Sequence, residues 1–243
     1  MLLGFALVLT RISAFFVVLP LFGWKTIPVQ IKAAAAILLS FFFYLIAPPV
    51  NLGGASPLTI FLLLAGEVIY GGALGLIIAL LFAVVQLSGC ILEEQMGLTM
   101  AEILDPLTEN EVGPFASLME MVFVLLFLSA NGHHMFLLVL SRSYDAFPAG
   151  TIPTISLLAG GVISTSAAMF IAGLRLAAPM LAAFLVLMVA LALLARLVPE
   201  MNILFISMPV RIALGIFLTA LFLPFINGFV MEMADWMTRL LPL

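Results

Sequence analysis

Six long apolar segments follow one another along the chain, with very few charged positions inside them. They cover residues 2–23, 29–47, 58–92, 116–141, 157–195 and 209–231. They lack the strict alternation of apolar and polar positions that is typical of membrane β-strands, and backbone in lipid must satisfy its own hydrogen bonds. The pattern therefore predicts an all-α, polytopic membrane-type protein with about six hydrophobic helical segments, organised as a single domain over residues 1–243.

Two of these segments have lengths that do not match a bilayer. A hydrocarbon core of about 30 Å is crossed by about 20 helical residues. Residues 58–92 and 157–195 would form straight helices of about 52 Å and about 58 Å at about 1.5 Å per residue. Each is too long for one crossing and short for two, so we expect these helices either to project from the bilayer or to fold back.

Glycine and proline positions suggest how the helices begin and pack. Gly71 and Gly75 are spaced as a small-xxx-small pair, which lets another helix backbone approach closely, although glycine is common in membrane helices in general. Pro28 and Pro209 are each followed within a few residues by a basic residue, and we predict that each stands at the first position of a helix.

Composition supports a membrane protein and excludes several functional classes. The chain is 65% hydrophobic and 8% charged, whereas an ordinary soluble domain has about 25% charged residues. Its net charge of −4 and its scattered basic residues argue against a nucleic-acid partner. Cys90 is the single cysteine, which excludes an internal disulfide. Nucleotide-binding, serine-hydrolase and zinc-protease motifs are lacking, so we predict no enzyme activity and no cofactor.

Three charged residues lie inside the apolar segments, at Arg11, Glu67 and Arg175. Placed in lipid, each would cost about 2.5–3.5 kcal/mol, so we expect all three to face protein or water. Arg11 with Glu67, or Glu67 with Arg175, would neutralise one another within the chain. The alternative is a charge that reaches the membrane interface or pairs with a neighbouring subunit.

The sequence NGHH at residues 131–134 raises the question of a metal site or proton relay, because imidazole binds metals and titrates near neutral pH. Adjacent side chains point about 100° apart on a helix. The chain has no further histidine to complete such a site. We therefore predict no metal site, and instead a helix break or an inter-subunit hydrogen-bonding role for Asn131 and His133.

Acidic residues gather in one part of the chain. Between residues 93 and 120 there are seven of its twelve acids and no lysine or arginine, namely Glu93, Glu94, Glu102, Asp105, Glu109, Glu111 and Glu120. Carboxylates in lipid would be prohibitively costly. The segment therefore either lines or closes a water-filled passage, or forms an ordinary solvated surface loop.

Several motifs in order along nearly the whole chain resemble one known family. They are RISAFFVVLPLFG followed by IPVQIK, then EVIYGGALG, LSGCILEEQMG with the later Asp105-Pro106, NGHHMFLLVLSRSYDAFPAG, and AAPMLAAFLVLMVALALLARLVPEMNILFISMPV. The family is that of the flagellar export-gate protein FliR and the type III secretion export-apparatus protein SctT. The resemblance implies bent helical hairpins, lifted largely out of the bilayer plane and assembled in a helical multi-subunit complex.

The same resemblance implies a function, partners and a plug in the export channel. The chain would form, with FliP-like and FliQ-like membrane subunits, a protein-conducting channel for unfolded flagellar subunits in the bacterial inner membrane at the flagellar basal body. A FlhB-like switch protein is a further expected partner. The plug residues implied by the resemblance are Met100, Ile103, Leu104, Asp105, Pro106, Glu109, Glu111, Val112 and Phe115.

Two other functional classes compete with this interpretation. A small-solute secondary transporter would use intramembrane charges such as Glu67 and Arg175 as a substrate or ion site, but such transporters usually show two related halves. The chain shows only one short internal similarity, between IPVQIK and MPVRIA. A membrane-embedded transferase would use His134 with Glu120 or Asp145, although nothing in the sequence arranges these groups as acid and base.

Overall fold

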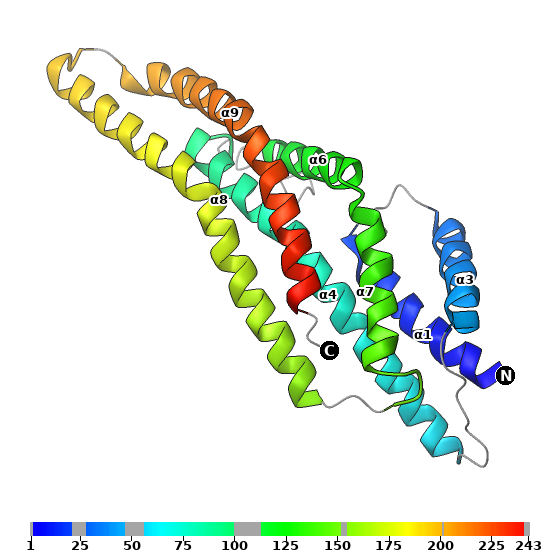
Figure 1. Cartoon of the computed structure of the whole chain (residues 1–243). Coiled ribbons are helices and arrows are strands. Elements are labelled where there is room, and N and C mark those ends of the chain that lie inside the picture. The colour runs from blue at the N-terminus through cyan, green and yellow to red at the C-terminus, as the bar shows by residue number, and fades with distance from the viewer. Residues whose placement is uncertain are drawn as a thin grey trace. The chain divides into compact units, whose positions relative to one another are not determined.

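The computed structural model describes residues 2–20, 28–46, 56–99, 113–151, 155–200 and 202–240. Within these residues all seven regular elements are α-helices, which confirms the predicted all-α class (Figure 1). They are α1 (Leu2–Val18), α3 (Val29–Ile46), α4 (Pro57–Met96), α6 (Pro114–Ser129), α7 (Gly132–Ala146), α8 (Ile155–Leu197) and α9 (Ile203–Leu240). Of the expected plug residues only Phe115 is among the described residues; Met100, Ile103, Leu104, Asp105, Pro106, Glu109, Glu111 and Val112 lie outside them.

The two segments of unusual length each form one uninterrupted helix. α4 has 40 residues and α8 has 43. Of the two arrangements expected from the sequence, folding back within the segment is therefore wrong for both. Pro179 lies inside α8, where a proline removes one backbone hydrogen bond but is tolerated in long apolar helices.

The segment predicted as one helix over residues 116–141 is instead two helices, and the break falls at NGHH as that motif suggested. Asn131 has a left-handed backbone with φ 60°, a conformation that asparagine adopts more readily than most residues. Ala130 closes α6 by donating its N–H to the carbonyl of Leu126 at 2.9 Å. The helix therefore stops at Ser129 and restarts at Gly132 because one residue leaves the right-handed region.

The positions predicted for two prolines also need correction. Pro28 precedes the first residue of α3, and its carbonyl accepts the N–H of Ile31 at 3.0 Å. It therefore stands one position before the helix and not within its first turn. Pro209 lies inside α9, which already begins at Ile203. The apolar residues before Pro209 continue the helix, and the loss of one N–H does not end it.

The chain divides into two compact units that each draw on separate parts of the sequence. Unit 1 comprises Met1–Phe82, Asn131–Ala168 and Met233–Leu243, and unit 2 comprises Ala83–Ala130 and Met169–Glu232. In unit 1, α1 lies beside α3 (Figure 1). The core of unit 2 is an apolar cluster that we call the unit 2 cluster, formed by Leu92, Met96, Met180, Phe184 and Leu218.

Much apolar helix surface is left uncovered by the chain itself. Only Ala36 and Ser40 of α3 are buried, while Phe41, Phe42 and Leu45 are exposed. Among the described residues, α3, α4 and residues 158–197 of α8 are long and apolar enough to cross a membrane, and α6 with α7 would count as a fourth if taken as one broken span. Exposed apolar surface of this extent requires lipid or protein neighbours.

Candidate functional site

A buried ion pair lies in unit 1, between α1 and α4. Arg11 donates its Nε–H to Oε2 of Glu67 at 2.5 Å, and the side chains of both residues are 1% exposed. Of the two pairings that the sequence left open, this is the one that the structure forms. Arg175 is exposed on α8 in unit 2.

The guanidinium of Arg11 also binds the end of α7. Its Nη1 donates to the carbonyl of Ser143 at 3.2 Å and to that of Phe147 at 2.9 Å. The last carbonyls of a helix lack intrahelical partners and carry the negative end of the helix dipole, so a cation is favoured there. Arg11 thus neutralises the charge of Glu67 and supplies hydrogen-bond donors to the carbonyls at the C-terminus of α7.

Two aromatic rings and a turn complete this arrangement, which we call the Arg11 cluster. The guanidinium carbon lies 4.7 Å from the ring centroid of Tyr70 and 4.4 Å from that of Tyr144, within the range of cation–π attraction. Glu67 accepts the N–H of Gly150 at 2.8 Å through its second oxygen. The cluster therefore joins α1, α4, α7 and the turn that follows α7.

Gly71 and Gly75 lie where α1 crosses α4. A side-chain carbon at Gly71 would collide with the backbone carbonyl of Arg11, and one at Gly75 would lie 2.9 Å from the carbonyl oxygen of Phe15. The absence of side chains therefore lets the two backbones touch, as the small-xxx-small spacing predicts. This close approach brings Arg11 within reach of Glu67, one turn earlier on α4.

A matched pair of substitutions tests this crossing. Gly71→Ala should destabilise the protein by about 1–3 kcal/mol, because the added methyl group must displace the backbone of α1. Gly72→Ala has open space around it and should stabilise α4 by about 0.5–1 kcal/mol through helix propensity. Thermal unfolding of the purified protein in detergent measures both changes. Equal effects of the two substitutions would show that α1 does not pack on Gly71.

In unit 2, Glu93 near the end of α4 binds the beginning of α6. Its side chain is 1% exposed. Oε1 accepts the N–H of Phe115 at 3.3 Å and Oε2 accepts the N–H of Ala116 at 3.1 Å. The first N–H groups of a helix lack intrahelical acceptors and form the positive end of its dipole. A carboxylate is therefore well placed there although the site is buried.

This geometry corrects one part of the sequence interpretation. The acidic stretch of the sequence predicts that Glu93 contacts water, whereas Glu93 is buried on α4. Glu94, the next residue on the same helix, is exposed. Gly113 and Pro114 at the start of α6 offer no side-chain oxygen as a cap. A glycine and a proline at a helix start, with no capping side chain, were the available signal that an acceptor must come from elsewhere.

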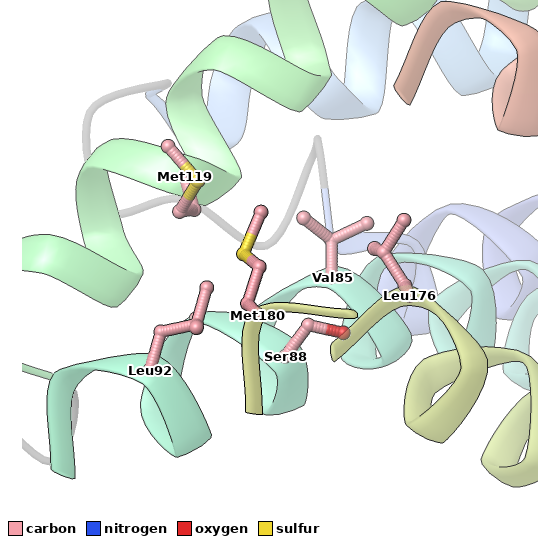
Figure 2. Close-up of a pocket in the computed structure, with 7 residues that line it drawn as sticks. Val85, Ser88, Leu92, Met119, Leu176 and Met180 are labelled. Carbon is pink, nitrogen blue, oxygen red and sulfur yellow. The ribbon is translucent and has the colours of Figure 1, made fainter. Parts of the chain in front are cut away.

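A small cavity of about 20 Å³ lies in unit 2 among α4, α6 and α8 (Figure 2). Its lining is apolar apart from Ser88, whose hydroxyl lies 2.8 Å from the carbonyl of Val84 and 3.1 Å from that of Gly173. The side chains that line it are Val85, Ser88, Leu92, Met119, Leu176 and Met180, together with Gly89 (Figure 2). A volume of this size and polarity suits packing between helices and not the binding of a ligand.

The remaining residues singled out from the sequence are not brought together. Asn131 and His133 are exposed, and the rings of His133 and His134 touch each other at 4.3 Å between centroids. Among the described residues, no group of three or more His, Cys, Asp or Glu side chains is arranged to hold a metal ion. Phe115 packs against the unit 2 cluster.

Comparison with known proteins gives a consistent result over the whole chain. A family model described as "Bacterial export proteins, family 1" matches residues 2–237. A flagellar biosynthetic protein FliR from Escherichia coli (strain K12) is 30% identical over 223 residues, covering 91% of this chain and 84% of the relative. One from Bacillus subtilis (strain 168) is 31% identical over 222 residues, covering 87% and 83%. One from Caulobacter vibrioides is 29% identical over 244 residues, covering 97% and 93%.

Proposed function

This chain belongs to the bacterial export proteins, family 1, and we propose that it works in the flagellar protein-export gate as one subunit of a protein-conducting channel. Its place in the flagellar export machinery follows from the family match over residues 2–237 and from FliR relatives about 30% identical over about 90% of the chain. The cargo is unfolded flagellar subunits, and the other channel subunits are FliP-like and FliQ-like membrane proteins. The chain acts as one export-gate domain without catalytic activity.

Two properties of the helices support an assembled state. α4 and α8 are about 60 Å or longer at about 1.5 Å per residue, which is twice the thickness of a bilayer core. Parts of such helices must meet surroundings other than hydrocarbon. In addition, the uncovered apolar faces of α3 and of α8 in unit 2 offer surface for packing against sister subunits.

The location follows from the same proposal. The protein is a membrane protein with several apolar helices, and the membrane is the bacterial inner membrane at the flagellar basal body. A FlhB-like switch protein binds the same complex. The segment from Met100 to Val112, together with Phe115, forms the channel plug: the apolar residues Ile103, Leu104 and Val112 pack to close the path, and the acids keep it wetted.

Copurification tests this function. The tagged chain, extracted from its native membrane in mild detergent, should be recovered mainly in a stable complex with two kinds of small helical membrane protein. The Gly72→Ala variant should be recovered in the same complex and serves as a control for substitution. A monomer or simple homo-oligomer that carries a small solute across vesicle membranes would contradict the proposal and would favour a secondary transporter.

A further inference from the structure

We propose that the face of α8 around Arg175 binds an apolar helix of a different subunit, and that a carboxylate within the apolar face of that helix pairs with Arg175. The proposal rests on the function proposed above, in which sister subunits surround this chain. Arg175 lies near the middle of the 43-residue helix. It is the only charged residue between positions 157 and 195.

Close packing on α4 fixes the side of α8 from which Arg175 projects. The carbonyl of Gly173 lies 3.1 Å from the hydroxyl of Ser88 on α4. Ala177 and Met180 are buried, and Met180 lines the cavity beside α4 (Figure 2). Arg175 is two residues from both Gly173 and Ala177, which is about 200° around a helix. Its side chain therefore leaves α8 on the side away from α4, where it is exposed.

The surface around Arg175 is apolar. Ile171 is 50% exposed and Leu174 is 42% exposed. Ala178 and Pro179, within the next turn, are also exposed. Apolar surface of this kind is normally covered by protein or by lipid. Whatever covers it must also supply an anion, because a cation taken out of water without a partner is costly.

Within the described part of the chain, no carboxylate forms an ion pair with Arg175. Glu93, a buried acid of unit 2, is bound to the N–H groups at the start of α6. Unit 1 shows the contrasting case, because there the chain itself supplies Glu67 as the partner of the buried Arg11. The anion that Arg175 needs therefore comes from a neighbouring molecule.

A lipid phosphate is the other common anion at the surface of a membrane protein. It would meet Arg175 at the bilayer surface if the uncharged residues 176–195, about 30 Å of helix, crossed the hydrocarbon core. However, Leu187 of α8 and Ile212 of α9 pack against the same unit 2 cluster. Arg211, next to Ile212, would then lie deep in hydrocarbon, where a charge is costly. A protein neighbour avoids this cost.

The experiment compares Arg175→Leu with Arg175→Lys in the export complex. The readout is the fraction of this chain that copurifies with other subunits. Arg175→Leu should lower that fraction by about tenfold or more, because it leaves the carboxylate of the partner buried without a cation. Arg175→Lys keeps the charge and should retain most of the complex. Leucine is favoured over arginine in lipid, so a lipid neighbour would give an unchanged or higher fraction, and this result would overturn the proposal.

Production of the chain alone separates assembly from folding. Arg175→Leu should then accumulate in membranes as the natural chain does, because Arg175 has no ion-pair partner within the described residues. An equal loss there would show a role within the chain and would overturn the proposal. A natural chain recovered without other subunits would contradict the proposed function as well. A natural complex that Arg175→Leu leaves intact would contradict the Arg175 contact alone.

Photo-crosslinking identifies the neighbour directly. Ala178 is exposed one turn from Arg175 and can be replaced by the crosslinking residue p-benzoylphenylalanine without changing Arg175. Light should join this position to a different subunit, at an apolar helix that contains Asp or Glu. The same product should fall about tenfold in an Arg175→Leu background. Attachment to lipid, to a second copy of this chain or to another part of the same chain would overturn the proposal.

Discussion

Replacement of Arg11 by alanine is expected to destabilise the protein by about 3–5 kcal/mol, the cost of leaving a buried charge without its partner. Glu67 would lose its cation, and the carbonyls of Ser143 and Phe147 would lose a donor. Glu67→Ala should have an effect of similar size, because it leaves the buried Arg11 without its counter-ion and the N–H of Gly150 without its acceptor. The readouts are the amount of protein that accumulates in membranes and its unfolding temperature in detergent.

Two controls show whether the Arg11 cluster acts through its geometry or through charge alone. Exchanging the two residues, with Arg11→Glu and Glu67→Arg, keeps both charges but places a carboxylate against the carbonyls at the end of α7. We expect that the exchanged chain does not regain the stability of the natural chain. Arg196→Ala removes a charge from an exposed site and should change the unfolding temperature little. The structure of this cluster would be contradicted if Arg11→Ala unfolded at the same temperature as the natural chain. It would also be contradicted if the exchanged chain regained the natural unfolding temperature.

Deletion of residues 106–112 is expected to raise leakage of small solutes through the assembled complex to a level that is readily measured in growing cells. The reason is that the segment is proposed to close the water-filled path. A seven-residue glycine and serine replacement keeps the length but removes the apolar and acidic side chains. It should leak as well, because it removes Val112 and the residues that follow Ile103 and Leu104.

The amount of complex must be measured beside permeability. Leakage that appears only when the complex is present would support the plug. Unchanged permeability in cells that assemble the complex normally would contradict it. The solvated surface loop, which the sequence left open, gives this second result.

The sequence predicted the helices well because apolar length and helix-breaking residues are local properties. It offered a helix break at NGHH as one of two alternatives, yet it also extended one apolar segment across that break. It placed Pro209 at a helix start, whereas the apolar residues before it continue α9. Apolar periodicity cannot tell whether a long segment folds back, because the choice depends on what surrounds the helix.

Contacts between distant residues were harder to predict. The charges of Arg11 and Glu67 showed that partners were needed, but Arg175 was an equal candidate, since pairing depends on how helices cross. The close approach at Gly71 decides the matter, and the sequence showed the glycine spacing without showing which helix it meets. For Glu93 the acidic residues around it suggested water, while its burial follows from the uncapped start of α6.

The most direct measurement of the central claim is a structure of the purified export complex. The helices described here should pack against sister subunits around an aqueous conduit, with residues 100–112 projecting into its central path. A chain that stands alone in the membrane, or a complex in which these residues face bulk solvent on the outer surface, would contradict the account.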